Sequence, residues 1–223
     1  MPALDWFHTA DQALADFDPA SFTAEVARAE AQRAVILDRA PLLVWPDLSV
    51  QDFAGDGADP SLASLLGKYA ATQSAPAPSS TLYWDHGRWR YPMGFGDERE
   101  AWQAMRAVFV RAFELVERGQ LDRIHGLGDR QHLDGLLLQA LAVYFPGTFL
   151  PIHAPDHLEL FARRLMGSKW KTAGLGRKRS VLLNARLLEL LRDRLGAEVD
   201  AVVARGLLYQ WSDPARMPPA VLK

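Results

Sequence analysis

The sequence predicts a mainly α-helical (α+β) fold, a multi-helix globular bundle with one small β-hairpin around residues 81–91. Three observations lead to this prediction. Apolar residues recur at three- and four-residue spacing along most of the chain, proline and glycine punctuate these stretches, and only one short segment is strand-like. A chain of 223 residues that is 49% hydrophobic has enough apolar surface to bury a core without disulfide bonds or a structural metal.

Two aspartate–proline pairs mark the starts of the helices predicted in the first third of the chain. Aspartate caps a helix, and proline fits its first turn. After Asp18-Pro19 the chain is rich in alanine, glutamate and arginine, and after Asp59-Pro60 leucines repeat at helical spacing. Residues 73–80 then break all periodicity with two prolines, and we expect a linker or a long surface loop there.

The strand-like segment follows this loop. Two short aromatic stretches flank a glycine-containing turn at residues 85–87, a pattern that predicts a hairpin. Because side chains alternate along a strand, Trp89 and Tyr91 share one face, and Arg88 and Arg90 share the other. We expect the aromatic face to pack partly on the following helix, since an isolated two-stranded hairpin needs such support.

Five further helices are predicted after the hairpin. The first begins at Asp97 and carries Trp102, Met105, Phe109 and Phe113 at three- and four-residue spacing, which indicates a stripe of core residues. Proline and glycine supply the breaks between the helices. The predicted helices cover about residues 97–118, 130–143, 155–167, 180–195 and 198–211.

Several classes of protein are disfavoured by what the sequence lacks. It has no cysteine, which excludes thiolate metal sites, cysteine nucleophiles and disulfide scaffolds. No apolar run approaches the roughly 20 residues of a membrane span, and the N-terminus lacks a secretory pattern, so we expect a cytoplasmic protein with no membrane partner. The nearest approach to a P-loop, at residues 174–180, lacks the required spacing, and no nucleophile neighbourhood stands out. We therefore expect no enzymatic activity and no cofactor in this chain.

The cluster His153-Ala154-Pro155-Asp156-His157 contains the residue types of a metal site. However, Pro155 starts a helix between the two histidines, so His153 and His157 do not share a helical face as i, i+4 ligands would. We predict no metal site, and we assign Asp156 to the first turn of the helix, where a carboxylate faces the helix dipole. A metal-dependent enzyme that uses the two histidines is the weakest functional alternative.

The charge distribution is the most informative feature of the sequence. No aspartate or glutamate occurs between Leu160 and Leu188, and removing the eight cations of this stretch from the net charge of −2 leaves −10 on the rest of the chain. An acidic protein with one concentrated basic segment suggests a directed contact with a polyanion, the alternative being a solvated loop that tolerates lysine. The eight cations are Arg163, Arg164, Lys169, Lys171, Arg177, Lys178, Arg179 and Arg186.

The part of this segment from Gly167 to Ser180 combines cations with three glycines and a tryptophan. Glycine lets the backbone lie close to a sugar–phosphate chain, and the cations neutralise phosphates and release counterions. Such a loop reads no bases, so specificity requires aromatic side chains that stack on a base, each worth roughly 1 to 3 kcal/mol. The predicted DNA-binding residues are Lys169, Trp170, Lys171, Arg177, Lys178 and Arg179 with Arg88 and Arg90 of the hairpin, and the stacking candidates are Tyr83, Trp84, Trp89 and Tyr91.

Two stretches resemble the N-terminal region of McrB-like proteins, the AAA-type subunits of methylcytosine-specific (type IV) restriction systems. The first is Ala142-Val143-Tyr144-Phe145-Pro146-Gly147-Thr148-Phe149-Leu150-Pro151-Ile152 followed by His157-Leu158-Glu159-Leu160-Phe161. The second combines Asn184 and Leu187-Leu188 with Leu207-Leu208-Tyr209-Gln210-Trp211-Ser212-Asp213-Pro214. Together with Trp102 and its helix, the resemblance covers about residues 81–214. It consists mostly of core residue types, so it identifies a scaffold more than a site.

The resemblance implies a DNA-binding specificity domain that recognises methylated cytosine in double-stranded DNA and recruits an AAA-type motor and a separate endonuclease. GTP or ATP with Mg is implied only for the motor, which this sequence lacks. The expected organisation is an N-terminal helical segment at 1–72, a linker or loop at 73–80, a recognition domain at 81–214 and a tail at 215–223 towards the missing motor. The family's glycine-rich, serine-containing stretch before the hairpin has no counterpart here, because residues 73–80 are rich in alanine, proline and serine.

The alternative is a protein-interaction or autoinhibitory module of a defence system, in which helical faces dock a partner and the basic loop is incidental. Charge reversal at Lys169, Lys171, Lys178 and Arg179 separates the two hypotheses. It abolishes DNA binding under the first and leaves partner binding largely intact under the second. The sequence alone leaves both open.

Overall fold

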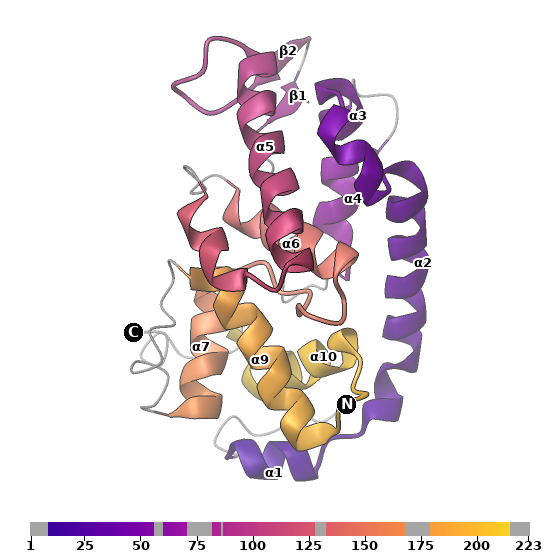
Figure 1. The fold of residues 1–223 in the computed structure, drawn as a ribbon. Helices are drawn as coiled ribbons and strands as arrows, with labels where there is room; N and C mark the ends of the chain where they lie inside the picture. The colour runs from indigo at the N-terminus through magenta and orange to yellow at the C-terminus, as the bar shows by residue number, and fades with distance from the viewer. Residues whose placement is uncertain are drawn as a thin grey trace.

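The computed structural model describes residues 9–55, 60–70, 82–85, 87–127, 133–167 and 179–214, and it is mainly α-helical with one two-stranded antiparallel sheet (Figure 1). This architecture confirms the predicted fold class. Among these residues, no helix is long and apolar enough to cross a membrane. In chain order the elements are α1 (Ala10–Ala15), η1 (Pro19–Phe22), α2 (Thr23–Arg39), η2 (Leu42–Asp47), α3 (Val50–Ala54), α4 (Leu62–Lys68), β1 (Tyr83–Asp85), β2 (Arg88–Arg90), α5 (Glu98–Glu117), η3 (Leu121–Gly126), α6 (Asp134–Tyr144), α7 (Pro155–Met166), α9 (Ser180–Leu195) and α10 (Ala201–Ser212).

The first predicted helix is present as a 3-10 turn followed by a long α-helix. Asp18 caps η1 as predicted, because its side chain accepts a hydrogen bond from the backbone N–H of Ala20, and Pro19 occupies the first turn. The chain then enters α2, on which buried Ala29 and Ile36 mark the face turned to the core. In Figure 1, α2 runs along one side of the molecule, and it packs against both α4 and α10.

The short helices α1 and α3 and the 3-10 segments η2 and η3 have no counterpart in the sequence prediction. α1 begins with a capping box in which Thr9 and Gln12 exchange hydrogen bonds, and α3 begins with the same device at Ser49. α4 is capped by Ser61, whose side chain accepts a hydrogen bond from the N–H of Ser64. The predicted cap of this helix, Asp59, lies outside the described residues.

Trp45 of η2 is the centre of the aromatic core. Its indole N–H donates to the hydroxyl of Tyr144 at 2.8 Å, and that hydroxyl donates to the carbonyl of Ala40. A polar group on each ring is thereby satisfied inside an apolar core, as burial requires. The Trp45 ring is fully buried and lies with its centroid 5.0 to 6.3 Å from the rings of Phe53, Phe109, Phe113 and Tyr144.

Nearly all buried apolar residues of the described chain form one cluster that reaches from Ala13 to Trp211. α4 packs on α6, and η2 packs on α5. The parts predicted as residues 1–72 and 81–214 therefore share one core wherever the structure describes them. The predicted linker at 73–80 and the tail at 215–223 lie outside the described residues, as does Thr81.

A buried asparagine fixes the extended segment between α6 and α7. The fully buried side chain of Asn184 in α9 accepts a hydrogen bond from the N–H of Leu150 at 2.7 Å. Its amide donates to the carbonyls of Leu150 and Ile152 at 2.9 and 3.1 Å. Among the described residues this backbone pairs with no strand, and the asparagine supplies hydrogen bonds that buried peptide groups require. The segment is thereby held against α9 just before α7 begins at Pro155.

The hairpin lies at one end of the molecule, next to the N-terminal end of α5 and apart from α7, α9 and α10 (Figure 1). α5 has 20 residues, and a rise of about 1.5 Å per residue makes it about 30 Å long. η3 follows the other end of α5 and packs on α9. The hairpin and α9 are therefore positioned towards opposite ends of α5.

Candidate nucleic-acid interface

The register of the hairpin decides which of its side chains share a face. Directly opposite residues of an antiparallel pair lie on the same face, and neighbours along one strand lie on opposite faces. One face therefore carries two tryptophans, and the other carries two arginines, a tyrosine and an aspartate. The opposed pairs are Tyr83 with Arg90, Trp84 with Trp89, and Asp85 with Arg88.

The tryptophan face is anchored to the helical body. Leu82, just before β1, is fully buried, and Trp89 and Tyr91 are half-buried against the core. The rings of Trp84 and Trp89 meet edge to face with their centroids 5.1 Å apart, and Trp84 keeps 38% of its surface exposed. This packing agrees with the expected support of the hairpin by the body. It leaves Trp84 as the more accessible of the two tryptophans for stacking on a base.

The arginine face is open to solvent. Tyr83 is 46% exposed, and Arg88 and Arg90 are both exposed. The Nε of Arg90 donates to a carboxylate oxygen of Asp85 at 3.1 Å, an ion pair of the exposed kind that contributes at most about 1 kcal/mol. Arg88 forms no ion pair with any residue in the described part of the chain. Guanidinium groups donate in pairs to phosphate oxygens, so this face has the chemistry of a backbone contact beside an aromatic ring.

A cleft beside the N-terminal half of α5 adds polar side chains that the sequence analysis missed. It lies between α5 and the η2–α3 connection and has a volume of about 370 Å³. The indole N–H of Trp102 and a guanidinium N–H of Arg106 both donate to the carbonyl of Leu48, at 2.7 and 3.1 Å. Arg99 and Gln103 line the same cleft and are exposed. The i, i+4, i+7 spacing of Arg99, Gln103 and Arg106 places them on one helix face, but it does not indicate the opposite wall of the cleft.

Carboxylates near the hairpin hold the ends of helices. Asp97 caps α5 by accepting a hydrogen bond from the N–H of Glu100 at 2.8 Å. The Glu100 carboxylate in turn accepts one from the N–H of Gly96 at 2.6 Å. These negative charges remain on the surface beside the arginines. The surface around the hairpin therefore presents individual guanidinium groups rather than a broad positive field.

Most of the predicted basic contact segment lies outside the described residues. Arg179, which immediately precedes α9, is described and exposed. Since α9 and the hairpin are positioned towards opposite ends of α5, the described residues do not join Arg179 and the hairpin arginines into one patch. The residues of the segment that lie outside the described part are Lys169, Trp170, Lys171, Arg177 and Lys178.

Three other cations of the acid-free stretch have partners within the fold. Arg163 and Arg186 each pair with a glutamate of their own helix, at 3.7 and 2.7 Å. The guanidinium of Arg164 lies over the ring of Trp211, 4.4 Å from its centroid, and so joins α7 to α10. Part of the positive charge counted in the sequence is therefore used in local packing.

His157 joins α7 to α10. Its Nδ1 and the hydroxyl of Tyr209 share a hydrogen bond of 2.8 Å. Burial lowers the pKa of His157 and raises the pKa of Tyr209 well above its usual range, so both side chains are neutral near pH 7. Within the described ranges, no group of three or more histidine, aspartate and glutamate side chains is placed to hold a metal ion. The described contacts of His157 are those of a packing residue.

Comparison of the chain with protein-family models, with curated protein sequences and with solved structures gave no match. The two stretches that resemble McrB-like proteins meet inside the molecule, because Asn184 of the second binds Leu150 and Ile152 of the first. They form a packing unit, as their residue types indicated. The exposed face of the hairpin lies outside both stretches.

Proposed function

We propose that the chain is a DNA-binding specificity module and that its hairpin end contacts the DNA. The observation that carries this proposal is the solvent-exposed face on which Arg88, Arg90 and Tyr83 come together. Arginines donate to phosphate oxygens, and an exposed ring stacks on an unpaired or flipped base. Because the opposite face is packed on the helical body, the hairpin presents these groups in a fixed orientation.

The cations predicted between Lys169 and Arg179 provide a second phosphate contact in this proposal. The hairpin and α9 are separated along an α5 of 20 residues, about 30 Å long. The length of α5 is close to one turn of B-DNA, roughly 34 to 36 Å. We propose that the hairpin and this segment engage phosphates about one helical turn apart on a single duplex.

The resemblance to McrB-like proteins supplies the biological setting of the proposal. We propose that the module recognises methylated cytosine, recruits an AAA-type motor and directs a separate endonuclease. GTP or ATP with Mg belongs to the motor in this scheme, and the chain itself contributes recognition rather than catalysis. The assembly acts in the cytoplasm, where it meets incoming DNA.

Binding to two short duplexes that differ only in cytosine methylation tests the proposal. Fluorescence anisotropy is measured while salt is raised from about 50 to about 200 mM. The methylated duplex should bind more tightly, and log affinity should fall with log salt at a slope of about −0.9 per neutralised phosphate. Equal affinity for the two duplexes would exclude recognition of the methyl group. Absence of any salt-dependent binding would exclude DNA as the ligand.

A protein-interaction or autoinhibitory module remains the competing function. Charge reversal at Lys169, Lys171, Lys178 and Arg179 separates the two functions. A DNA-binding module loses duplex affinity on this change. An interaction module binds its protein partner as before and shows no duplex affinity to lose.

A further inference from the structure

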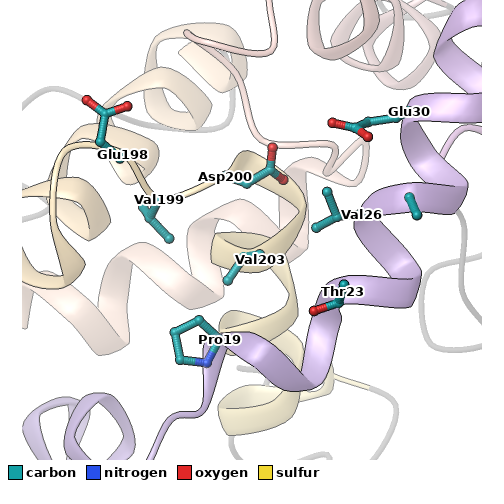
Figure 2. Close-up of a pocket in the computed structure, with 9 residues that line it drawn as sticks. Pro19, Thr23, Val26, Glu30, Glu198, Val199, Asp200 and Val203 are labelled. Atoms are coloured by element: carbon teal, nitrogen blue, oxygen red, sulfur yellow. The ribbon is translucent and has the colours of Figure 1, made fainter.

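A groove between α2 and α10 combines apolar and acidic side chains that the DNA-binding proposal does not use (Figure 2). Its volume is about 440 Å³, and it is open to solvent. η1 and the first half of α2 form one wall. The turn before α10 and the first turn of that helix form the other.

The groove is apolar at its centre and acidic along one side. Val26, Val199 and Val203 converge in the middle of Figure 2, and three carboxylates stand above them. One of these, Asp200, caps α10 by accepting a hydrogen bond from the N–H of Val202 at 2.7 Å. The other two, Glu30 and Glu198, are exposed and form no ion pair with any residue that the structure describes.

The two walls of the groove are held together by a close contact beside it. Phe22, at the end of η1, lies so near Gly206 of α10 that a Cβ on this residue would be 2.2 Å from the Phe22 ring. A larger residue at position 206 would require the Phe22 ring to move, so glycine permits this close approach of η1 and α10. A groove that is formed before its ligand arrives binds with little cost in ordering.

We propose that this groove docks a basic amphipathic segment of a partner protein, with an apolar side chain among the valines and a lysine or arginine beside Glu30 and Glu198. Charge complementarity identifies the occupant, because these carboxylates attract a cationic segment and repel both DNA and acidic segments. A groove between two helices that is apolar at its centre and charged along one side suits an amphipathic helix. The surface is separate from the hairpin, so the proposal does not rest on DNA binding.

A pair of fluorescent synthetic peptides tests the proposal on the full chain. LKKLLKLLKKLL is the basic amphipathic probe, and LEELLELLEELL is its acidic counterpart. The chain should bind the basic probe and not the acidic one. Combining Glu30→Lys with Glu198→Lys should weaken binding at least roughly tenfold, because two attractions become two repulsions. Val199→Ser should weaken it as well, through the loss of apolar contact in the groove.

A matched control makes the same charge change elsewhere. Glu117, the last residue of α5, and Asp122 of η3 are both exposed, and Glu117→Lys with Asp122→Lys should keep the affinity within about twofold of the wild type. If the two double variants lose the same affinity for the basic probe, the probe is attracted unspecifically to an acidic protein. This result would overturn the proposal. Failure of the wild-type chain to bind the basic probe overturns it too.

The third outcome concerns a small ligand. In this outcome the chain binds neither peptide, while hexylamine perturbs the methyl NMR signals of Val26 and Val199. This result would assign the groove to small amines and reject the peptide proposal. Duplex binding is measured on the same variants and should not weaken, because the groove lies away from the hairpin. The docking proposal and the DNA-binding proposal therefore fail independently.

Discussion

Replacing Asn184 with alanine should destabilise the fold by several kilocalories per mole. The N–H of Leu150 and the carbonyl of Ile152 lose the partner that the asparagine provides. The carbonyl of Leu150 keeps a second hydrogen bond, from the N–H of Ile152 at 2.7 Å. At about 1 to 3 kcal/mol for each buried group left unsatisfied, the two groups amount to about 2 to 6 kcal/mol. That is a large share of the roughly 5 to 15 kcal/mol that holds a domain folded.

Urea unfolding followed by tryptophan fluorescence measures this loss. With an m-value of about 3 kcal/mol/M, the midpoint should fall by about 0.7 to 2 M. Asn184→Asp should be at least as damaging, because a carboxylate keeps the acceptor for Leu150 but faces two carbonyl oxygens without a hydrogen to donate.

Arg186→Ala is the control on the same helix. Arg186 is exposed and pairs with Glu189 at the surface, so its loss should change the free energy of unfolding by less than about 0.5 kcal/mol. A loss below about 1 kcal/mol for Asn184→Ala would show that water or a local rearrangement satisfies these groups. The assignment of Asn184 as the clamp of this segment would then be wrong.

Two further changes test the contacts of α10. Gly206→Ala should destabilise the wild type by about 1 to 3 kcal/mol through the clash with Phe22. In a Phe22→Ala background the same change should stabilise the protein by up to about 1 kcal/mol, because alanine favours a helix. A double-mutant cycle measured by urea unfolding tests this, and equal effects of Gly206→Ala in the two backgrounds would exclude the contact. Burial lowers the folded-state pKa of His157, so the unfolded chain binds the proton more readily. The neutral side chain of His157 therefore stabilises the folded state above about pH 6.5, and this stabilisation is lost as the pH falls towards the lowered pKa. Urea midpoints at about pH 7.5 and 5.5 should therefore differ less for His157→Phe than for the wild type, and an undiminished difference would contradict the assignment.

The helices that could be predicted are those in which long apolar periodicity meets a cap. α5 is the clearest case, because Asp97 precedes a core stripe that runs from Trp102 to Phe113. α1 and α3 are too short to show a period. Their only signals are the capping boxes at Thr9 and Ser49, and such residues also form turns. η2 contains Pro46 and follows no period that the sequence reveals.

The candidate interface could be predicted only where it depends on local order. Alternation along β2 correctly separated Trp89 from Arg88 and Arg90, because it needs no tertiary information. The cleft beside α5 depends on η2 and α3 packing against Arg99 and Arg106, which no local pattern encodes. Charge counting could not show that Arg163, Arg164 and Arg186 have partners inside the fold, since those contacts depend on helix faces and on the meeting of α7 with α10.

The groove between α2 and α10 could not be predicted for the same reason. Val26 and Val199 are far apart in the chain and meet only because the first and last long helices pack side by side. Local periodicity indicates which side of a helix is apolar. It does not indicate which distant helix supplies the opposite wall.

The salt dependence of duplex binding by the double variant Arg88→Ala with Arg90→Ala tests the hairpin contact most directly. Loss of two phosphate contacts should make the slope of log affinity against log salt shallower by about 1.8. Arg118→Ala with Arg123→Ala removes the same charge from the other end of α5 and should keep the wild-type slope. If the hairpin variant keeps the wild-type slope, or if the control variant shows an equally shallow slope, the proposed contact between the hairpin and DNA is wrong.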